Sequence, residues 1–163
     1  MTTIAYKGGV IAYDSRITRG TIIDYEDYEK LVEVKGIKFV LAGATADFPR
    51  LIDAYFGAPV TNIDASALAV DGETVWCVGH NDTDGLWKFE VLPDRPYAIG
   101  SGTTHALTAM DMGANAFQAV EMAAKRDTST GGKIRTLMVG THEQTVSSPE
   151  ERVMGNQHKK IAG

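Results

Sequence analysis

The stretch that decides the fold opens the chain, where residues 2–13 read Thr-Thr-Ile-Ala-Tyr-Lys-Gly-Gly-Val-Ile-Ala-Tyr. Two apolar runs, Thr3 to Tyr6 and Val10 to Tyr13, flank Lys7-Gly8-Gly9. Glycine readily adopts the positive φ angles that a tight hairpin turn requires. The stretch therefore predicts a strand, a tight turn and a second strand, with a threonine directly behind the initiator methionine.

Outward from this hairpin, apolar residues alternate between strand and helix periodicities. Glycine and Asp-Gly turns separate the strand patterns, and Pro49 is tolerated in a helix only because it falls in the first turn. Strand structure is expected at residues 17–23, 30–34, 37–42, 65–70, 74–78, 86–91, 97–99 and 134–139. Helices are expected at residues 47–56, 104–112 and 116–125.

This order of elements indicates an α+β fold. Strands, a helix, more strands, two helices and a last strand fit two stacked sheets with helices on their outer faces. A generic α+β domain is the alternative that the pattern alone leaves open. A length of 163 residues predicts a single domain over 1–163, with a loose tail from about residue 154.

The composition excludes several functional classes. A net charge of −5 argues against a nucleic-acid-binding protein. No apolar run reaches the ~18 residues of a membrane span, and no signal sequence is visible, so the cytoplasm is the expected compartment. Cys77 is the only cysteine, which excludes an intrachain disulfide and a Cys-based metal cluster. No cofactor is expected. Residues 80–85 carry two carboxylates but are expected to form a hairpin turn rather than a calcium site.

Thr2 carries the chemistry that the sequence offers. Methionine is commonly removed before a small residue, and its removal would leave Thr2 with a hydroxyl and a free α-amine. That pair is a nucleophile with its own general base. Met-Thr is also an ordinary way for a protein to begin, so the rest of the chain must supply the supporting groups.

Further segments follow Thr2 in a characteristic order: Asp14-Ser15-Arg16, Lys30, Ala42-Gly43, Gly100-Ser101-Gly102 and residues 126–132. In this order and spacing the chain resembles the proteasome β subunits and the bacterial HslV peptidase, from Thr2 to about Val139. The resemblance implies a four-layer αββα sandwich of the N-terminal nucleophile (Ntn) hydrolase type. It also implies a threonine-type endopeptidase.

The same resemblance assigns catalytic roles. Thr2 would be the nucleophile, Lys30 would lower the pKa values of its hydroxyl and amine, and Asp14 would pair with Lys30. Without the resemblance, Lys30 reads as a surface lysine that opens a strand, and Asp14 as a turn residue. The resemblance assigns Gly43 as the backbone donor to the oxyanion. It assigns a polar cluster around the amine to Ser101, Asp127 and Thr130. Proteasome subunits usually carry serine at the position of Thr130.

Substrate contacts are expected on one side of Thr2. Thr18 falls where the family pairs its backbone with an extended substrate, which would add a strand. The substrate side-chain pocket is expected to be lined by residues near Ile17, Tyr28, Val32, Leu41 and Thr45. This wall is mostly apolar, which predicts cleavage after apolar residues.

The chain departs from the family after Phe56, where only a short connection precedes the strand expected at Ala65. Relatives carry a second long helix there, so a shortened outer helical layer and altered contacts between stacked rings are expected. The partners implied by the resemblance are unfolded polypeptides or peptides, further copies in a homo-oligomeric ring and an ATP-dependent unfoldase. An amidase or acylase for small amides on the same fold, and a catalytically silent scaffold, are the alternatives.

Overall fold

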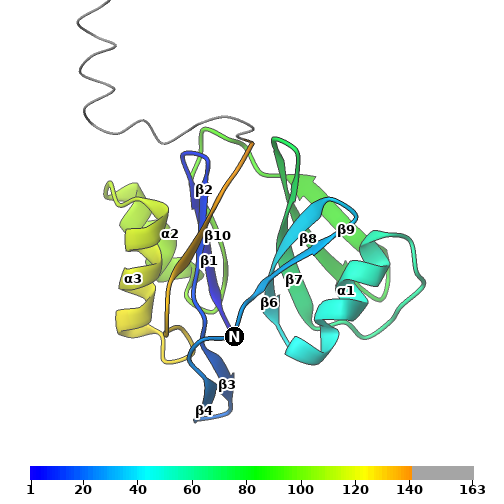
Figure 1. Ribbon diagram of the computed structural model, residues 1–163, viewed down its shortest axis with the longest axis horizontal. Coiled ribbons are helices and arrows are strands. Elements are labelled where there is room, and N and C mark those ends of the chain that lie inside the picture. The colour runs from blue at the N-terminus through cyan, green and yellow to red at the C-terminus, as the bar shows by residue number, and fades with distance from the viewer. Residues whose placement is uncertain (141–163) are drawn as a thin grey trace, which may run out of the picture.

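The computed structural model describes residues 1–140, so the tail expected from residue 154 lies outside the described part. The chain forms two antiparallel sheets and a separate hairpin (Figure 1). The smaller sheet has the order β10-β1-β2-β11, with β1 Thr3–Lys7, β2 Val10–Tyr13, β10 Tyr97–Gly100 and β11 Arg135–Met138. The larger sheet has the order β5-β6-β7-β8-β9, with β5 Leu31–Val34, β6 Ile37–Gly43, β7 Ala65–Asp71, β8 Thr74–Asn81 and β9 Gly85–Glu90.

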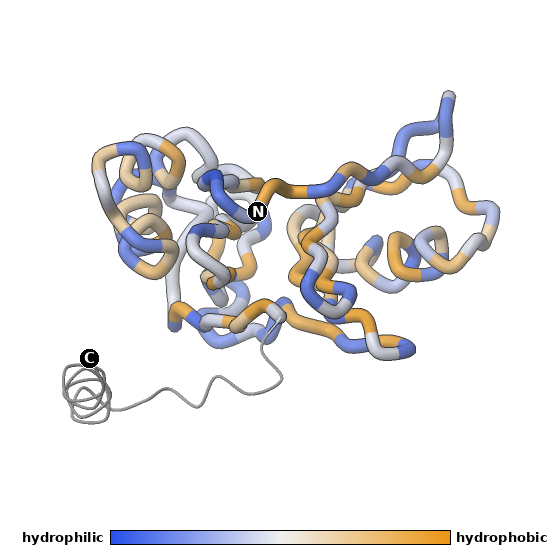
Figure 2. The backbone as a smooth tube through the Cα atoms, turned by 90° about the horizontal axis from the view of Figure 1, so that it is seen from above, coloured by the Kyte–Doolittle hydropathy of each residue, from blue (hydrophilic) through white to orange (hydrophobic). Residues whose placement is uncertain are grey.

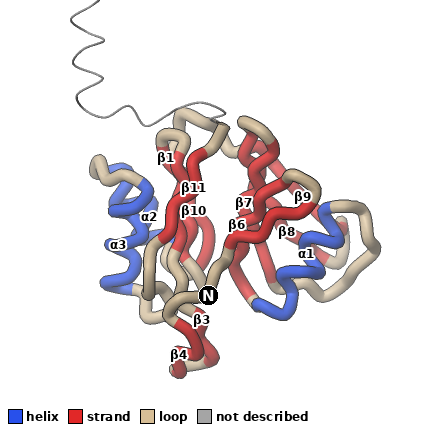
Figure 3. Tube along the Cα trace, in the orientation of Figure 1, coloured by secondary structure: helices blue, strands red, loops and turns tan. Residues whose placement is uncertain are grey.

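Helices cover the outer face of each sheet, and the molecule therefore has four layers. Helices α2 (Thr103–Asp111) and α3 (Ala116–Arg126) lie against the smaller sheet. Helix α1 (Phe48–Tyr55), preceded by a short 3₁₀ turn at Thr45–Asp47, lies against the larger one (Figure 3). The expected αββα sandwich is thereby confirmed, and the fold class is α+β.

Alternation along β1 and β2 explains how the layers pack. Ile4, Tyr6, Ile11 and Tyr13 point into the core between the sheets, whereas Ala5 and Ala12 point toward α2 and α3. Large side chains thus fill the space between the sheets, and small ones let the helices approach closely. Seen from above, hydrophobic stretches follow the strands and the helix faces that meet them (Figure 2).

Most expected elements lie within two residues of their positions in the structure, with two exceptions. The strand structure expected at 17–23 divides into a hairpin, β3 (Ile17–Arg19) and β4 (Ile22–Tyr25), because Gly20 turns the chain with φ +60°. The turn expected at 80–85 is shorter, since β8 continues to Asn81. The β3–β4 hairpin projects beyond both sheets near the N-terminus (Figure 3).

The short connection after α1 matches the expectation. No helix lies between Tyr55 and Ala65. Instead Arg50 donates to the carbonyls of Thr61 and Asn62 and pairs with Asp47. Asp47 also accepts from the Asp64 N–H at 2.8 Å, which fixes the end of the connection beside α1. Among residues 1–140, no helix is long and apolar enough to cross a membrane.

Candidate active site

Thr2 directly precedes β1, and the N-terminus lies between the two sheets, next to the β3–β4 hairpin (Figure 1). The exposed fraction of Thr2 is 1%, whereas Met1 is 58% exposed. A hydrogen bond fixes the backbone of Thr2, because its carbonyl accepts from the Ser101 N–H at 2.7 Å. The pairing of β1 with β10 thus fixes the position of Thr2, whose buried hydroxyl lies one residue from the exposed Met1.

Lys30 and Asp14 form a buried chain of polar contacts with Thr2. The Lys30 Nζ donates to Thr2 Oγ1 at 2.8 Å and to Asp14 Oδ1 at 2.8 Å. The side chains of Lys30 and Asp14 are both fully buried. Lysine is almost never fully buried without a partner, so the interpretation of Lys30 as a surface lysine is wrong.

Asp14 is itself fixed by backbone donors from three segments. Its Oδ1 accepts from the Thr3 N–H at 3.1 Å, and its Oδ2 accepts from the Gly131 N–H at 2.9 Å. The Arg16 N–H adds a longer contact to Oδ2 at 3.3 Å. These donors offset the free-energy cost of burying the Asp14 carboxylate and orient it toward Lys30.

The environment lowers the pKa of two amines near Thr2. Burial lowers the pKa of Lys30, and the charge of Asp14 opposes this shift without cancelling it. The pKa of the Met1 α-amine is also lowered, first by burial and then by the charge of Lys30. The Met1 α-amine therefore holds its proton more weakly than a fully exposed α-amine.

A second polar cluster lies on the other side of β1. Asp127 Oδ2 accepts from the Ser101 hydroxyl at 2.5 Å and from the Thr130 hydroxyl at 2.6 Å. Burial raises the pKa of the Asp127 carboxyl, but these hydrogen bonds and one from the Ser129 N–H outweigh burial, so the pKa lies below its usual value. The Thr130 and Thr3 hydroxyls are 2.6 Å apart, which connects the cluster to β1.

Two glycines allow close approach of backbone segments, Gly43 beside Asp64 and Gly100 beside Thr2. Gly43 ends β6 with φ +109°, and a Cβ there would lie 2.5 Å from the Asp64 carbonyl oxygen. Lys30 and β6 are directly connected, because the Leu41 N–H donates to the Lys30 carbonyl at 3.0 Å. Gly100 has φ +101°, and a Cβ there would lie 1.7 Å from the Thr2 carbonyl oxygen.

Gly100→Ala is expected to displace Thr2 and to lower the free energy of unfolding by at least about 2 kcal/mol, because strain at positive φ adds to the clash. Gly20→Ala is the matched control, since Gly20 also has positive φ but has no atom within 4 Å of the added Cβ. Chemical denaturation of the two variants tests this. Equal losses in the free energy of unfolding of the two variants would show that the clash with Thr2 does not contribute to the loss.

Four of the six residues expected to contact substrate line one of two cavities. Tyr28, Val32 and Thr45 line a cavity of about 320 Å³, whose other walls include Phe48 and Ile52 of α1. Leu41 is fully buried in the core cluster that also contains Phe48 and Ile52, so it supports this cavity without lining it.

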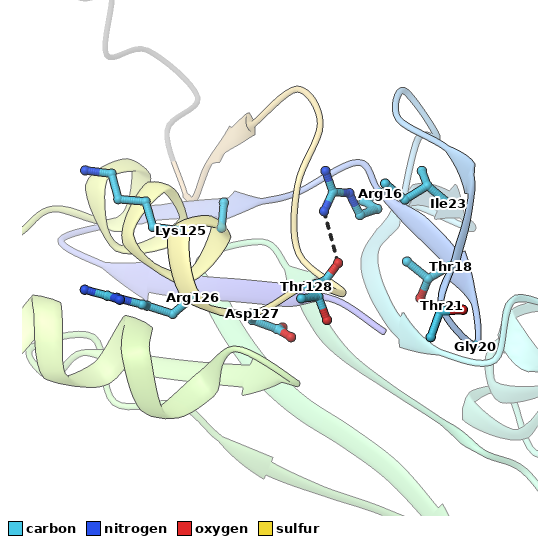
Figure 4. Close-up of a pocket in the computed structure, with 10 residues that line it drawn as sticks. Arg16, Thr18, Gly20, Thr21, Ile23, Lys125, Arg126, Asp127 and Thr128 are labelled. Carbon is cyan, nitrogen blue, oxygen red and sulfur yellow. Dashed lines mark hydrogen bonds between the residues drawn. The ribbon is translucent and has the colours of Figure 1, made fainter.

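Thr18 belongs to the second cavity, of about 440 Å³, between the β3–β4 hairpin and the end of α3 (Figure 4). Asp127 lines the same cavity, whereas Ile17 lines neither. In Figure 4, Lys125 and Arg126 extend away from the hairpin, and Arg16 points to the Thr128 carbonyl.

Sequence reasoning left three supporting residues without a role: Thr3, Arg16 and Gly131. Arg16 pairs with Glu26 at 2.7 Å and donates to the Thr128 carbonyl at 3.0 Å, so it holds the 126–132 segment over the site. A Cβ at Gly131 would lie 2.4 Å from the guanidinium carbon of Arg16, so a larger residue there would displace Arg16. Arg16 follows Asp14 in a segment already singled out, and that proximity was the available signal.

Among the described residues, no group of three or more His, Cys, Asp or Glu side chains is arranged to hold a metal ion.

Comparison with known proteins gives the same relatives as the motifs. No family model matches the sequence. The curated proteasome subunit beta type-5 of Gallus gallus is 26% identical over 179 aligned positions, covering 85% of this chain and 70% of that protein. The chain resembles a proteasome β subunit in sequence.

Solved structures extend the likeness to the fold. Eukaryotic HslV from Trypanosoma brucei superposes with a TM-score of 0.64 at 19% identity, covering 85% of this chain and 98% of that one. The Thiobacillus denitrificans protein BPH superposes with a TM-score of 0.61 at 19% identity, covering 87% and 99%. A complex of BPH with epoxomicin gives 0.59 at 20% identity, covering 83% and 96%. The proteasome-like fold is therefore established.

Proposed function

We propose that this chain is a threonine peptidase that uses Thr2 as its N-terminal nucleophile once Met1 is removed. The observation that carries the proposal is the buried Lys30 ammonium, placed 2.8 Å from both Thr2 Oγ1 and Asp14 Oδ1. A structural ion pair needs only Lys30 and Asp14. The additional contact with a hydroxyl next to the chain end is the feature that nucleophilic catalysis requires.

The first step is acylation. The Thr2 hydroxyl gives its proton to the α-amine, and Oγ1 attacks the carbonyl carbon of the scissile peptide bond. Lys30 stabilises the negative charge on Oγ1. The Gly43 N–H is assigned as a donor to the oxygen that becomes negative. The carbon–nitrogen bond then breaks, the leaving amine takes the proton, and an ester joins the substrate to Thr2.

The second step is hydrolysis of that ester. A water molecule gives a proton to the α-amine and attacks the ester carbon. The bond to Oγ1 then breaks, so that a carboxylic acid leaves and the Thr2 hydroxyl recovers its proton. Ser101, Asp127 and Thr130 are assigned to orienting the amine and this water, since their hydroxyls and carboxylate already form one connected cluster.

The substrates are proposed to be peptides or unfolded polypeptides. The cavity formed by Tyr28, Val32 and Thr45 is walled by apolar side chains of α1, which favours an apolar side chain on the acyl side of the cleaved bond. Thr18 is proposed to pair with the extended substrate backbone. By likeness to its relatives, the protein is proposed to assemble as a homo-oligomeric ring and to receive substrate from an ATP-dependent unfoldase.

Exposure of Thr2 is the test of this proposal. Protein produced with a cleavable leader that leaves Thr2 first should hydrolyse peptides. Protein that retains Met1 should be inactive, because an amide nitrogen cannot serve as a base. The pKa of a free α-amine is about 7.7–8.0, so a usable fraction is neutral at pH 7. Equal turnover by the two preparations, with N-termini verified by mass spectrometry, would require a different general base.

A further inference from the structure

Strand β9 is one of the two outer strands of the larger sheet and exposes two large aromatic side chains. Within residues 1–140 it pairs only with β8. Trp87 and Phe89 are 37% and 45% exposed, and their rings stack with centroids 6.0 Å apart. An exposed edge strand that carries large apolar side chains is a template for pairing with another strand.

The hydrogen-bond pattern defines which groups of β9 are free to pair. The Val91 N–H donates to Val75 at 2.8 Å, and Phe89 faces Cys77 in the same register. Because backbone groups alternate along an antiparallel strand, the N–H and C=O of the odd-numbered residues point to β8. Those of Leu86, Lys88 and Glu90 therefore point outward.

The side chains of β9 divide between two faces. Lys88 lies over the Trp76 ring at 4.5 Å and near the Tyr55 ring of α1 at 5.2 Å, so it faces the α1 side of the sheet. Glu90, two residues on, shares that face. Phe89 faces the opposite way and meets the Tyr97 ring edge-on at 5.9 Å.

We propose that β9 pairs antiparallel with β9 of a second copy of this chain, about a two-fold axis that passes through Phe89. In this register the outward groups of Lys88 bond those of Glu90 of the second copy, and the reverse pair forms by symmetry. On the α1 side of the sheet, each Lys88 side chain thus lies opposite the Glu90 side chain of the other copy. On the other face the two Phe89 side chains meet, and Trp87 faces Val91 of the second copy.

Charge selects this register over its neighbours. The two strands can form hydrogen bonds only where residues with outward backbone groups, which are the even-numbered ones, face each other. Alternative registers therefore differ by a shift of the two-fold axis by one residue. A shift in one direction places Lys88 opposite Lys88, and a shift in the other places Glu90 opposite Glu90. Like charges directly opposite are destabilising, whereas the proposed register also pairs Leu86 with the exposed Leu92.

This contact goes beyond the proposed peptidase function and does not depend on it. A two-fold contact uses the same surface on both subunits and cannot by itself close a cyclic ring of more than two members. It would therefore join subunits of two different rings, or form a free dimer.

Charge reversal tests the register. Lys88→Glu places four carboxylates on one face and should weaken dimerisation about tenfold. Lys88→Glu/Glu90→Lys restores both pairs with exchanged charges and should recover it. Sedimentation of full-length protein over a concentration series measures this, with thermal melting as the folding control. Folded Lys88→Glu with wild-type association, or a double variant no better than the single one, would overturn the register.

Cysteine cross-linking tests the contact itself, whatever the size of the assembly. The two Phe89 residues form a non-hydrogen-bonded pair, whose Cα atoms lie about 4.5 Å apart, within the range of a disulfide. Phe89→Cys should form a covalent dimer under mild oxidation. Ile22→Cys, on the exposed strand β4, is the control, and buried Cys77 is common to both. If Phe89→Cys cross-links no faster than Ile22→Cys, β9 is a charge-guarded free edge and the proposal is wrong.

Discussion

Replacing Thr2 with alanine is expected to reduce peptide hydrolysis by at least ~10⁴-fold, since removal of a nucleophile removes the covalent step altogether. The fold should persist, because the strand pairing of β1 with β10 and β2 involves only the backbone. The Lys30 ammonium keeps Asp14 as a partner but loses its contact with Oγ1, which is expected to cost about 1–3 kcal/mol of stability.

The matched variant is Thr2→Ser, which keeps the hydroxyl and the position of its oxygen. It should retain measurable turnover where Thr2→Ala has none. Steady-state kinetics with a fluorogenic peptide, on protein lacking Met1, compares the two. Equal residual activity in Thr2→Ala and Thr2→Ser would place the nucleophile elsewhere.

Lys30→Met is expected to impair both activity and stability. Turnover should fall by at least ~10³-fold, because nothing then stabilises charge on Oγ1. The free energy of unfolding should fall by about 3–5 kcal/mol, because the Asp14 carboxylate stays buried without its cation. The backbone donors from Thr3 and Gly131 reduce this loss without removing it.

Two controls separate these effects. Lys38→Met, at a half-buried position of β6, should change stability by less than about 0.5 kcal/mol and leave turnover intact. Lys30→Met/Asp14→Asn should be less destabilised than the sum of the two single variants, since both charges are then absent. Strict additivity in urea denaturation would mean that Lys30 and Asp14 do not form a coupled pair.

Much of the fold was predictable because local signals agree with the global arrangement. The Lys35-Gly36 turn between β5 and β6 is one example, since both residues have positive φ as a tight hairpin requires. The division of residues 17–23 into β3 and β4 was not predicted, because β-branched residues favour strand on both sides of Gly20.

The candidate site was predictable where the order of residues carries the information, as for Thr2, Asp14 and Lys30. The burial of Lys30 was not, because it depends on backbone donors to Asp14 that come from segments as distant as Gly131. The lining of the proposed substrate pocket was harder still to predict. Leu41 has the apolar character of a lining residue, but helix α1 covers it, and no local pattern records that coverage.

One measurement tests the central claim, that Thr2 is an N-terminal nucleophile. Protein beginning at Thr2 is treated with a peptidyl epoxyketone, whose ketone and epoxide offer electrophiles to a hydroxyl and an adjacent amine. Intact mass and peptide mapping then locate the adduct. We expect one equivalent on Thr2, and none on Thr2→Ala or on protein that retains Met1. Labelling at another residue, or a Thr2-first protein that stays unmodified while it hydrolyses peptides, would contradict the account.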